Sequence, residues 1–73
     1  MDEVQREAWL SLAQQRRRHL QDIVDTSHRA EADFLIAGNY QDAETQRRRT
    51  LEAAVALERV EMEIELLARE IGA

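Results

Sequence analysis

The chain has 73 residues, contains no cysteine or proline, and carries a formal net charge of −5 from 15 acidic and 10 basic residues. A chain of this length forms one small domain, and without cysteine it has neither disulfides nor thiolate metal ligands to support its core. A net acidic surface also argues against non-specific nucleic-acid binding, which depends on basic surface. Association with another chain is the remaining route to stability, so we expect a protein-binding function.

The sequence gives no indication of membrane insertion or secretion. No apolar run approaches the roughly 18 residues that a membrane-spanning helix requires. The first residues, MDEVQREAW, include acidic side chains and no apolar core segment, unlike a secretory signal. We therefore expect a cytoplasmic protein without membrane contact.

The first predicted helix covers residues 2–37. Asp2 is a good N-cap and Gln5 stands three residues later, as in a capping box. Alanine, leucine, glutamate, glutamine and arginine dominate the composition, so helix propensity is high almost throughout. The segment 25–27, DTS, contains three residues that favour helix caps, which leaves open a break or kink inside this helix.

One strong interruption of the helical pattern lies near the middle of the chain. Gly38 suits the left-handed position that follows many helices. Asn39 is then a good N-cap for the next helix, and Asp42 stands three residues later. The second predicted helix covers residues 40–71, with Gly72 just past its end.

Both predicted helices carry an apolar seam with steps of three and four residues, the spacing of a coiled coil. Folding about residues 38–39 brings opposite one another residues whose numbers add up to about 77. The predicted fold is therefore all-α: a coiled-coil-like antiparallel two-helix hairpin that forms a single domain over residues 1–73. The first seam consists of Arg6, Trp9, Ala13, Arg16, Leu20, Ile23, Ser27, Ala30, Phe34 and Ala37, and the second of Ala43, Gln46, Thr50, Ala53, Leu57, Val60, Ile64, Leu67 and Ile71.

The sequence contains more apolar surface than one seam consumes. A two-stranded coil needs two apolar positions in seven, whereas a helix in a bundle needs three. We expect a second copy to cover the surplus, giving a homodimer with a four-helix bundle. A helix of an unidentified protein partner is the alternative. The surplus predicted beside the two seams consists of Leu51, Val55, Met62 and Leu66 on the second helix and of Leu10, Leu12, Val24 and Ile36 on the first.

The three aromatic residues mark the two ends of the predicted hairpin. Trp9 is expected to cover the open end of the core. Phe34 and Tyr40 flank the turn, where they either plug the core or form an exposed apolar tip that binds a partner. The predicted partner-binding residues are Phe34, Leu35, Ile36, Tyr40, Leu51, Val55, Met62 and Leu66.

Two arginine runs, 16–18 and 47–49, are the most conspicuous charged segments. Three consecutive residues of a helix point in three directions, so each run forms a belt around its helix and not a patch. We expect both runs to be solvated and to form cross-helix ion pairs, and the weaker alternatives are contact with the acidic surface of a partner and nucleic-acid binding. The expected partners are Glu58, Glu61 and Glu63 for the first run, and Asp25, Glu31 and Asp33 for the second.

Nothing in the sequence predicts catalysis, a cofactor or a metal site. There is no nucleophile beside a base, no glycine-rich phosphate loop and no metal motif. A two-helix chain also offers no concave pocket unless a dimer creates one. The leading prediction is a non-enzymatic interaction module acting as an adaptor, a small regulator or an assembly chaperone. The alternative is an acidic inhibitor whose segment 58–70 presents carboxylates like a row of phosphates to a nucleic-acid-binding enzyme.

Two short segments resemble known helical hairpins. The segment 37–43, AGNYQDA, resembles the inter-helix turn of tetratricopeptide-type modules, in which an aromatic follows a Gly-Asn turn and an alanine comes three residues later. The rest of that repeat pattern is missing, so no peptide-binding residue carries over. The chain is also similar in size, acidic balance and segment 50–54, TLEAA, to small hairpin co-chaperones of type III secretion. This second likeness implies an assembly-chaperone role and assigns no site residue.

Overall fold

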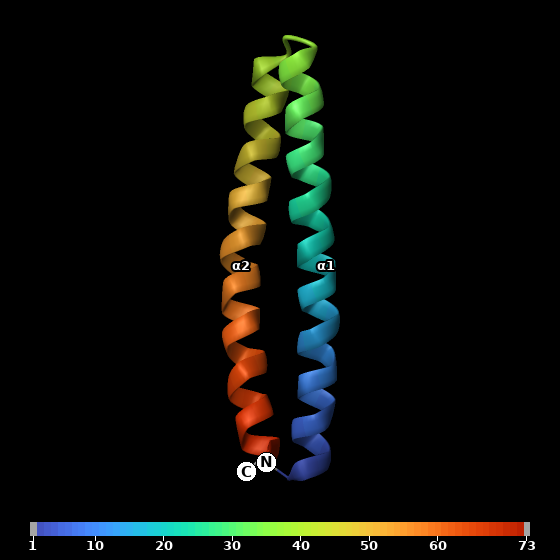
Figure 1. The fold of residues 1–73 in the computed structure, drawn as a ribbon, viewed down its shortest axis with the longest axis vertical. Helices are drawn as coiled ribbons and strands as arrows, with labels where there is room; N and C mark the ends of the chain where they lie inside the picture. Colours follow the sequence, from blue (N-terminus) through green and yellow to red (C-terminus); the bar gives the residue numbers. More distant parts are fainter. Residues whose placement is uncertain (1, 73) are drawn as a thin grey trace.

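The computed structural model describes residues 2–72, which form two helices joined by a short turn. Helix α1 spans Glu3–Ile36 and helix α2 spans Tyr40–Gly72. The helices lie antiparallel, so the start of α1 and the end of α2 lie at the same end of a rod whose Cα atoms extend over 53 × 14 × 14 Å (Figure 1). Met1 and Ala73, the ends of the predicted domain, lie outside the described residues. The predicted all-α hairpin is confirmed.

The start of α1 is the predicted capping box. The backbone N–H of Gln5 donates to Oδ1 of Asp2 at 2.8 Å, and the Gln5 side chain accepts from the backbone N–H of Asp2 at 3.4 Å. These bonds satisfy backbone donors that have no partner within the helix. The helix ends at Ile36, with Ala37 as its C-cap, one residue earlier than predicted.

The turn between the helices follows from the glycine. Gly38 has a φ of +78°, a left-handed conformation that glycine adopts without steric cost. Its N–H donates to the carbonyl of Leu35 at 3.1 Å, and the N–H of Asn39 donates to the carbonyl of Phe34 at 2.8 Å. Both bonds satisfy carbonyl groups at the end of α1, which is the Schellman arrangement.

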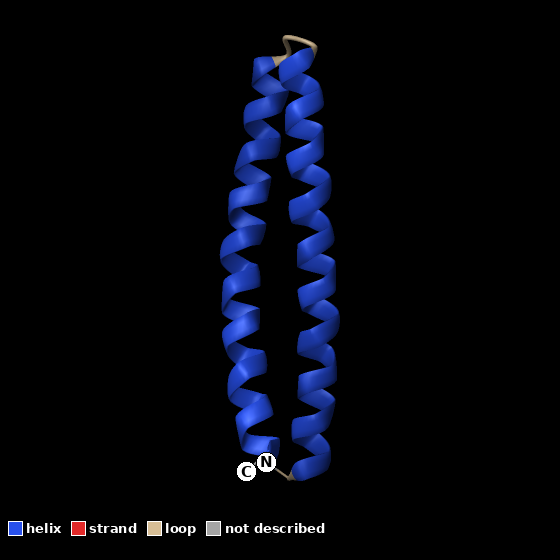
Figure 2. Cartoon of the chain, in the orientation of Figure 1, coloured by secondary structure: helices blue, strands red, loops and turns tan. Residues whose placement is uncertain are grey.

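Asn39 caps the start of α2, as predicted. Its Oδ1 accepts from the backbone N–H of Asp42 at 3.3 Å, and its Nδ2 donates to the Asp42 carboxylate at 2.6 Å. Figure 2 shows that α2, like α1, is helical along its length and that the loop joining the two helices lies at the tip. The helix includes Gly72, which the sequence placed just past its end. Neither helix is long and apolar enough to cross a membrane.

Small side chains dominate the seam between the helices. The buried apolar residues are Ala13, Ala43, Ala53 and Val60, and every member of the second predicted seam is buried or half-buried. The first predicted seam is confirmed except at three exposed positions, Trp9, Arg16 and Ala37. Trp9 keeps 48 % of its surface exposed, so it covers the open end only in part.

A pair of hydroxyl groups joins the helices near the middle of the seam. The side chains of Ser27 and Thr50 lie 2.7 Å apart, and either oxygen can donate. Ser27 also donates to the carbonyl of Ile23, and Thr50 donates to that of Gln46 at 2.9 Å. Each hydroxyl has one proton, so at any moment one hydroxyl donates to its own helix while the other donates across the seam.

This hydroxyl pair has two consequences for the fold. The predicted register places opposite one another residues whose numbers add up to about 77. Ser27 and Thr50 fit this register, and the ion-paired residues Arg6 and Glu70, 3.6 Å apart, differ from it by one residue. The helix also continues through the segment 25–27, so the break that the sequence left open does not occur. Ser27 uses its hydroxyl within the helix and across the seam instead of capping a new helix.

The left-handed turn predicts an effect of Gly38→Ala that comes from the backbone alone. A Cβ at this position would meet nothing within 4 Å, so the substitution introduces no clash with neighbouring groups. We expect Gly38→Ala to lower the free energy of unfolding by about 1–2 kcal/mol, and Gly38→Asn by less, because asparagine tolerates this conformation. Urea unfolding followed by circular dichroism measures both variants. An alanine variant as stable as the parent would contradict the argument.

The hydroxyl pair predicts energetic coupling between Ser27 and Thr50. Ser27→Ala and Thr50→Val should each lower the free energy of unfolding by about 0.5–1.5 kcal/mol, because each leaves the opposite hydroxyl without its partner across the seam. The double variant should lose less than the sum, since removing both groups leaves no polar atom unpaired there. A double-mutant cycle in urea tests this, and strictly additive losses would show that the pair does not interact.

Candidate partner-binding surface

The hairpin leaves much of its apolar surface in contact with solvent. Within residues 2–72 no side chain is completely shielded, and the buried apolar residues are three alanines and one valine. Large apolar side chains are normally the ones that a core encloses. Here many of them stay exposed: Val4, Trp9, Leu12, Leu35, Ile36, Tyr40, Leu51, Val55, Met62 and Leu66.

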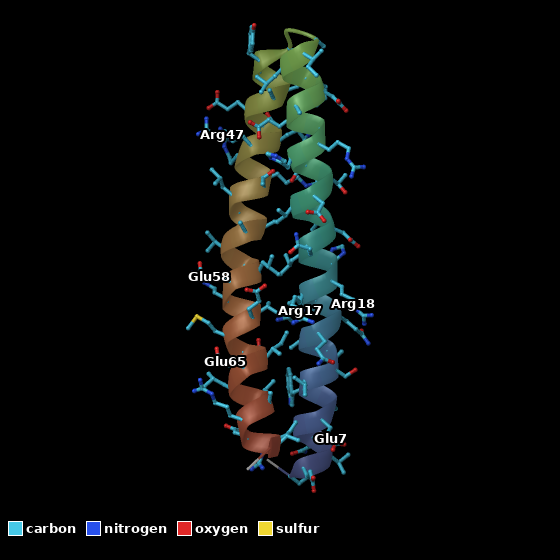
Figure 3. All side chains as sticks on the ribbon, viewed as in Figure 1. Glu7, Arg17, Arg18, Arg47, Glu58 and Glu65 are labelled. Atoms are coloured by element: carbon cyan, nitrogen blue, oxygen red, sulfur yellow. The ribbon has the colours of Figure 1, made fainter. Side chains whose placement is uncertain are left out.

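Four of these residues form one stripe on α2. Leu51, Val55, Met62 and Leu66 are between 52 % and 60 % exposed. At 3.6 residues per turn they fall within a sector of about 60°, turned about 170° from the seam. Figure 3 shows Glu58 pointing away from α1, and Leu51 is seven residues before it on the same side of α2. We call these four residues the outer face of α2.

The position of this face differs from the expectation. The sequence predicts these four residues beside the seam, as in a bundle helix whose apolar sector is broad. The structure places them on the side of α2 that faces away from α1. Helix α2 therefore has two apolar faces on opposite sides, and α1 covers one of them.

The predicted tip residues divide between the seam and the surface. Phe34 is half-buried in its seam position, which fits a core plug. Leu35 and Tyr40 are exposed and line a shallow groove of about 230 Å³ together with Ala43 and Arg47. Ile36 is the most exposed large apolar residue, at 87 %, and helix geometry turns it about 100° away from Leu35.

A second shallow groove connects the tip with the outer face of α2. This groove, of about 270 Å³, is lined by Leu51 and Arg48. Glu44 and Arg47 line both grooves, so the surface around Tyr40 continues into that of Leu51. Of the eight predicted partner-binding residues, the structure joins Leu35 and Tyr40 to the outer face of α2.

A polar groove on the hairpin was missed by sequence reasoning. It has a volume of about 180 Å³ and extends across both helices, contradicting the expectation that a two-helix chain has no concavity. Ser27, which is buried in the seam, is one of its lining residues. In the described part of the chain no group of three or more His, Cys, Asp or Glu side chains is placed to hold a metal ion. The lining residues are His19, Asp22, Ile23, Thr26, Ser27, Gln46 and Arg49.

The expected ion pairs of the arginine runs do not form. Among residues 2–72 the salt bridges are Arg6 with Glu70 and, within α2, Arg69 with Glu65. All six arginines of the runs 16–18 and 47–49 are exposed, and Arg18 projects away from α2 in Figure 3. The prediction is wrong because an exposed pair gains only about 0.2–1 kcal/mol, which barely offsets the entropy of holding two long side chains.

The runs also remain apart on the hairpin. In the register of Ser27 with Thr50, Arg17 and Arg48 are separated by about 12 residues along the rod, or about 18 Å. Figure 3 shows Arg17 and Arg47 at different levels of the rod. The runs therefore do not combine into one basic patch of the kind that tracks a phosphate backbone.

The acidic segment 58–70 is interrupted by arginines. Glu65 is paired with Arg69, and Glu70 with Arg6 of α1. Arg59 adds a further positive charge within the segment. A continuous row of carboxylates resembling phosphates is thus not formed, although the inhibitor hypothesis stays a prediction.

Comparison with known proteins adds no further constraint on this surface. No protein-family model, curated protein or solved structure matches the chain. The interpretation of the surface therefore depends on its own geometry and chemistry.

The different environments of Phe34 and Tyr40 predict different effects of truncation. Phe34 is half-buried between the helices, whereas Tyr40 is 70 % exposed. We expect Phe34→Ala to lower the free energy of unfolding by about 1–3 kcal/mol, and Tyr40→Ala to change it by less than about 0.5 kcal/mol. Urea unfolding of the two variants side by side tests the assignment. Equal losses would mean that Tyr40 also belongs to the core.

Proposed function

We propose that this protein is a non-enzymatic protein–protein interaction module of the cytoplasm that acts through exposed apolar helix surface. One observation supports the proposal above all: the hairpin buries three alanines and one valine, while ten large apolar side chains remain exposed. Covering a half-exposed side chain of this size contributes on the order of 1 kcal/mol. Association with another chain would therefore remove these apolar side chains from water and so stabilise the folded hairpin.

The arrangement of the exposed residues supports a specific role. Scattered single apolar residues are normal on protein surfaces, whereas contiguous apolar patches with polar borders mark interaction sites. The outer face of α2 extends over about four turns as two apolar pairs, Leu51 with Val55 and Met62 with Leu66, which are separated by the charged residues Glu58 and Arg59. Such a face receives the apolar stripe of another helix. The proposed roles are those of an adaptor, a small regulator or an assembly chaperone.

Self-association is the simplest form of this function. A second hairpin gives a homodimer with four helices, in which each copy supplies the surface that the other lacks. Small domains commonly reach stability in this way when they have no disulfide or metal. An additional protein partner would then bind apolar surface that the dimer leaves open, such as the tip around Leu35 and Tyr40.

The proposal predicts that the state of the protein depends on its concentration. We expect light scattering to show a rise from the monomer mass toward a dimer mass between about 1 and about 100 µM, because the exposed apolar surface is covered by mass action. Helix content and the thermal midpoint, followed by circular dichroism, should rise over the same range. A monomer that stays fully helical and equally stable throughout would contradict the proposal.

A further inference from the structure

Helix α2 carries a row of large apolar residues on the side opposite its seam, whereas the outward side of α1 is polar through its middle and carries exposed Ile36 at the tip. The outward positions of α1 carry Ser11, Arg18 and Asp25, all exposed and polar. The corresponding side of α2 carries the outer face, Leu51, Val55, Met62 and Leu66. Helix α2 therefore has apolar surface for two neighbouring helices on opposite sides, and α1 is one of them.

We propose that the second neighbour is α2 of another copy, packed antiparallel across a two-fold axis near Glu58 and Arg59. This inference depends on the proposed function and specifies its interface. The spacing of the outer face supports it: Leu51 and Leu66 are equally far from the midpoint between Glu58 and Arg59, and so are Val55 and Met62. A two-fold axis at that midpoint brings Leu51 to the level of Leu66 of the second copy. It also brings Val55 to the level of Met62, so each apolar residue meets apolar surface.

Charge selects the antiparallel orientation. Parallel packing would place the run 47–49 of one copy beside the same run of the other, and like charges in an interface destabilise it. Antiparallel packing places Arg47 at the level of Glu70 of the second copy and within reach of Glu65. Glu58 and Arg59 are adjacent and opposite in charge, so the centre of the interface is locally neutral in either orientation.

The size of the contact predicts a weak and reversible dimer. With the axis at this midpoint, about 28 residues of α2 overlap, a strip about 42 Å long and about 12 Å wide. Each copy then covers about 500 Å², and the total of about 1,000 Å² is at the lower limit for specific interfaces. Helix α1 lies on the opposite side of α2, so neither copy obstructs the approach of the other.

Single introduced cysteines test the register, since the described chain has no cysteine of its own. A mixture of Val55→Cys and Met62→Cys proteins, one carrying a mass tag, is equilibrated in a glutathione buffer. We expect the mixed disulfide dimer to exceed either same-variant dimer by about tenfold. In the proposed packing two copies of position 55 are about 10 Å apart along the axis, beyond the span of a disulfide.

Arg18→Cys, on the outer side of α1, sets the background level of cross-linking. A predominant Val55→Cys homodimer would overturn the antiparallel orientation. Cross-linking no higher than that of Arg18→Cys, in a sample that light scattering shows to be dimeric, would overturn the interface and leave the proposed function intact. A monomer at every concentration would overturn both.

A matched pair of charge insertions tests the same face without cysteine chemistry. Val55 and Leu12 are 52 % and 53 % exposed, so both tolerate a glutamate within the hairpin. We expect Val55→Glu to raise the dissociation constant of the dimer by at least about tenfold, because the two-fold axis places two buried charges in each interface. Leu12→Glu should leave it unchanged. Equal effects of the two variants would overturn the proposed face.

Discussion

The hydroxyl pair of Ser27 and Thr50 lies in the middle of a seam made of small side chains, and the remaining features of the hairpin follow from that seam. Polar groups can lie between two helices only when each finds a partner, and here both do. The pair fixes the register and occupies the hydroxyl of Ser27, which in the segment 25–27 would otherwise favour a helix break. Alanine at Ala13, Ala43 and Ala53 completes a seam with little volume to bury.

A seam of small residues leaves the hairpin short of apolar burial. An alanine removes far less apolar surface from water than leucine or methionine does. The residues that could add burial are present, but Leu51, Val55, Met62 and Leu66 lie on the side of α2 away from α1. Stability and interaction are therefore linked, because the large apolar side chains that the core lacks are exposed on the outer face of α2, where a partner can bind them.

Much of the fold could be predicted from short sequence patterns, because each pattern has one structural interpretation. Glycine at position 38 has a physical reason to end a helix, and a seam with steps of three and four residues sets a register once the turn is known. Other features depend on the conformations of long side chains, which a helical wheel does not predict. Arginines in runs can pair across the seam or remain solvated, and Trp9 can fold over the open end or stay half outside. The polar groove around Ser27 depends on the size difference between neighbours, which periodicity alone does not report.

Within the proposed dimer, the position of the outer face favours one of two kinds of four-helix assembly. In a closed bundle each helix contacts two neighbours around a common core, so its apolar faces adjoin in one broad sector. On α2 the seam and the outer face are turned about 170° apart, so one common core cannot cover both. A row of four helices, with the two α2 helices in the centre and an α1 on each outer side, covers both faces. Such a row leaves the polar outer side of α1 in water, where Ser11, Arg18 and Asp25 are well solvated.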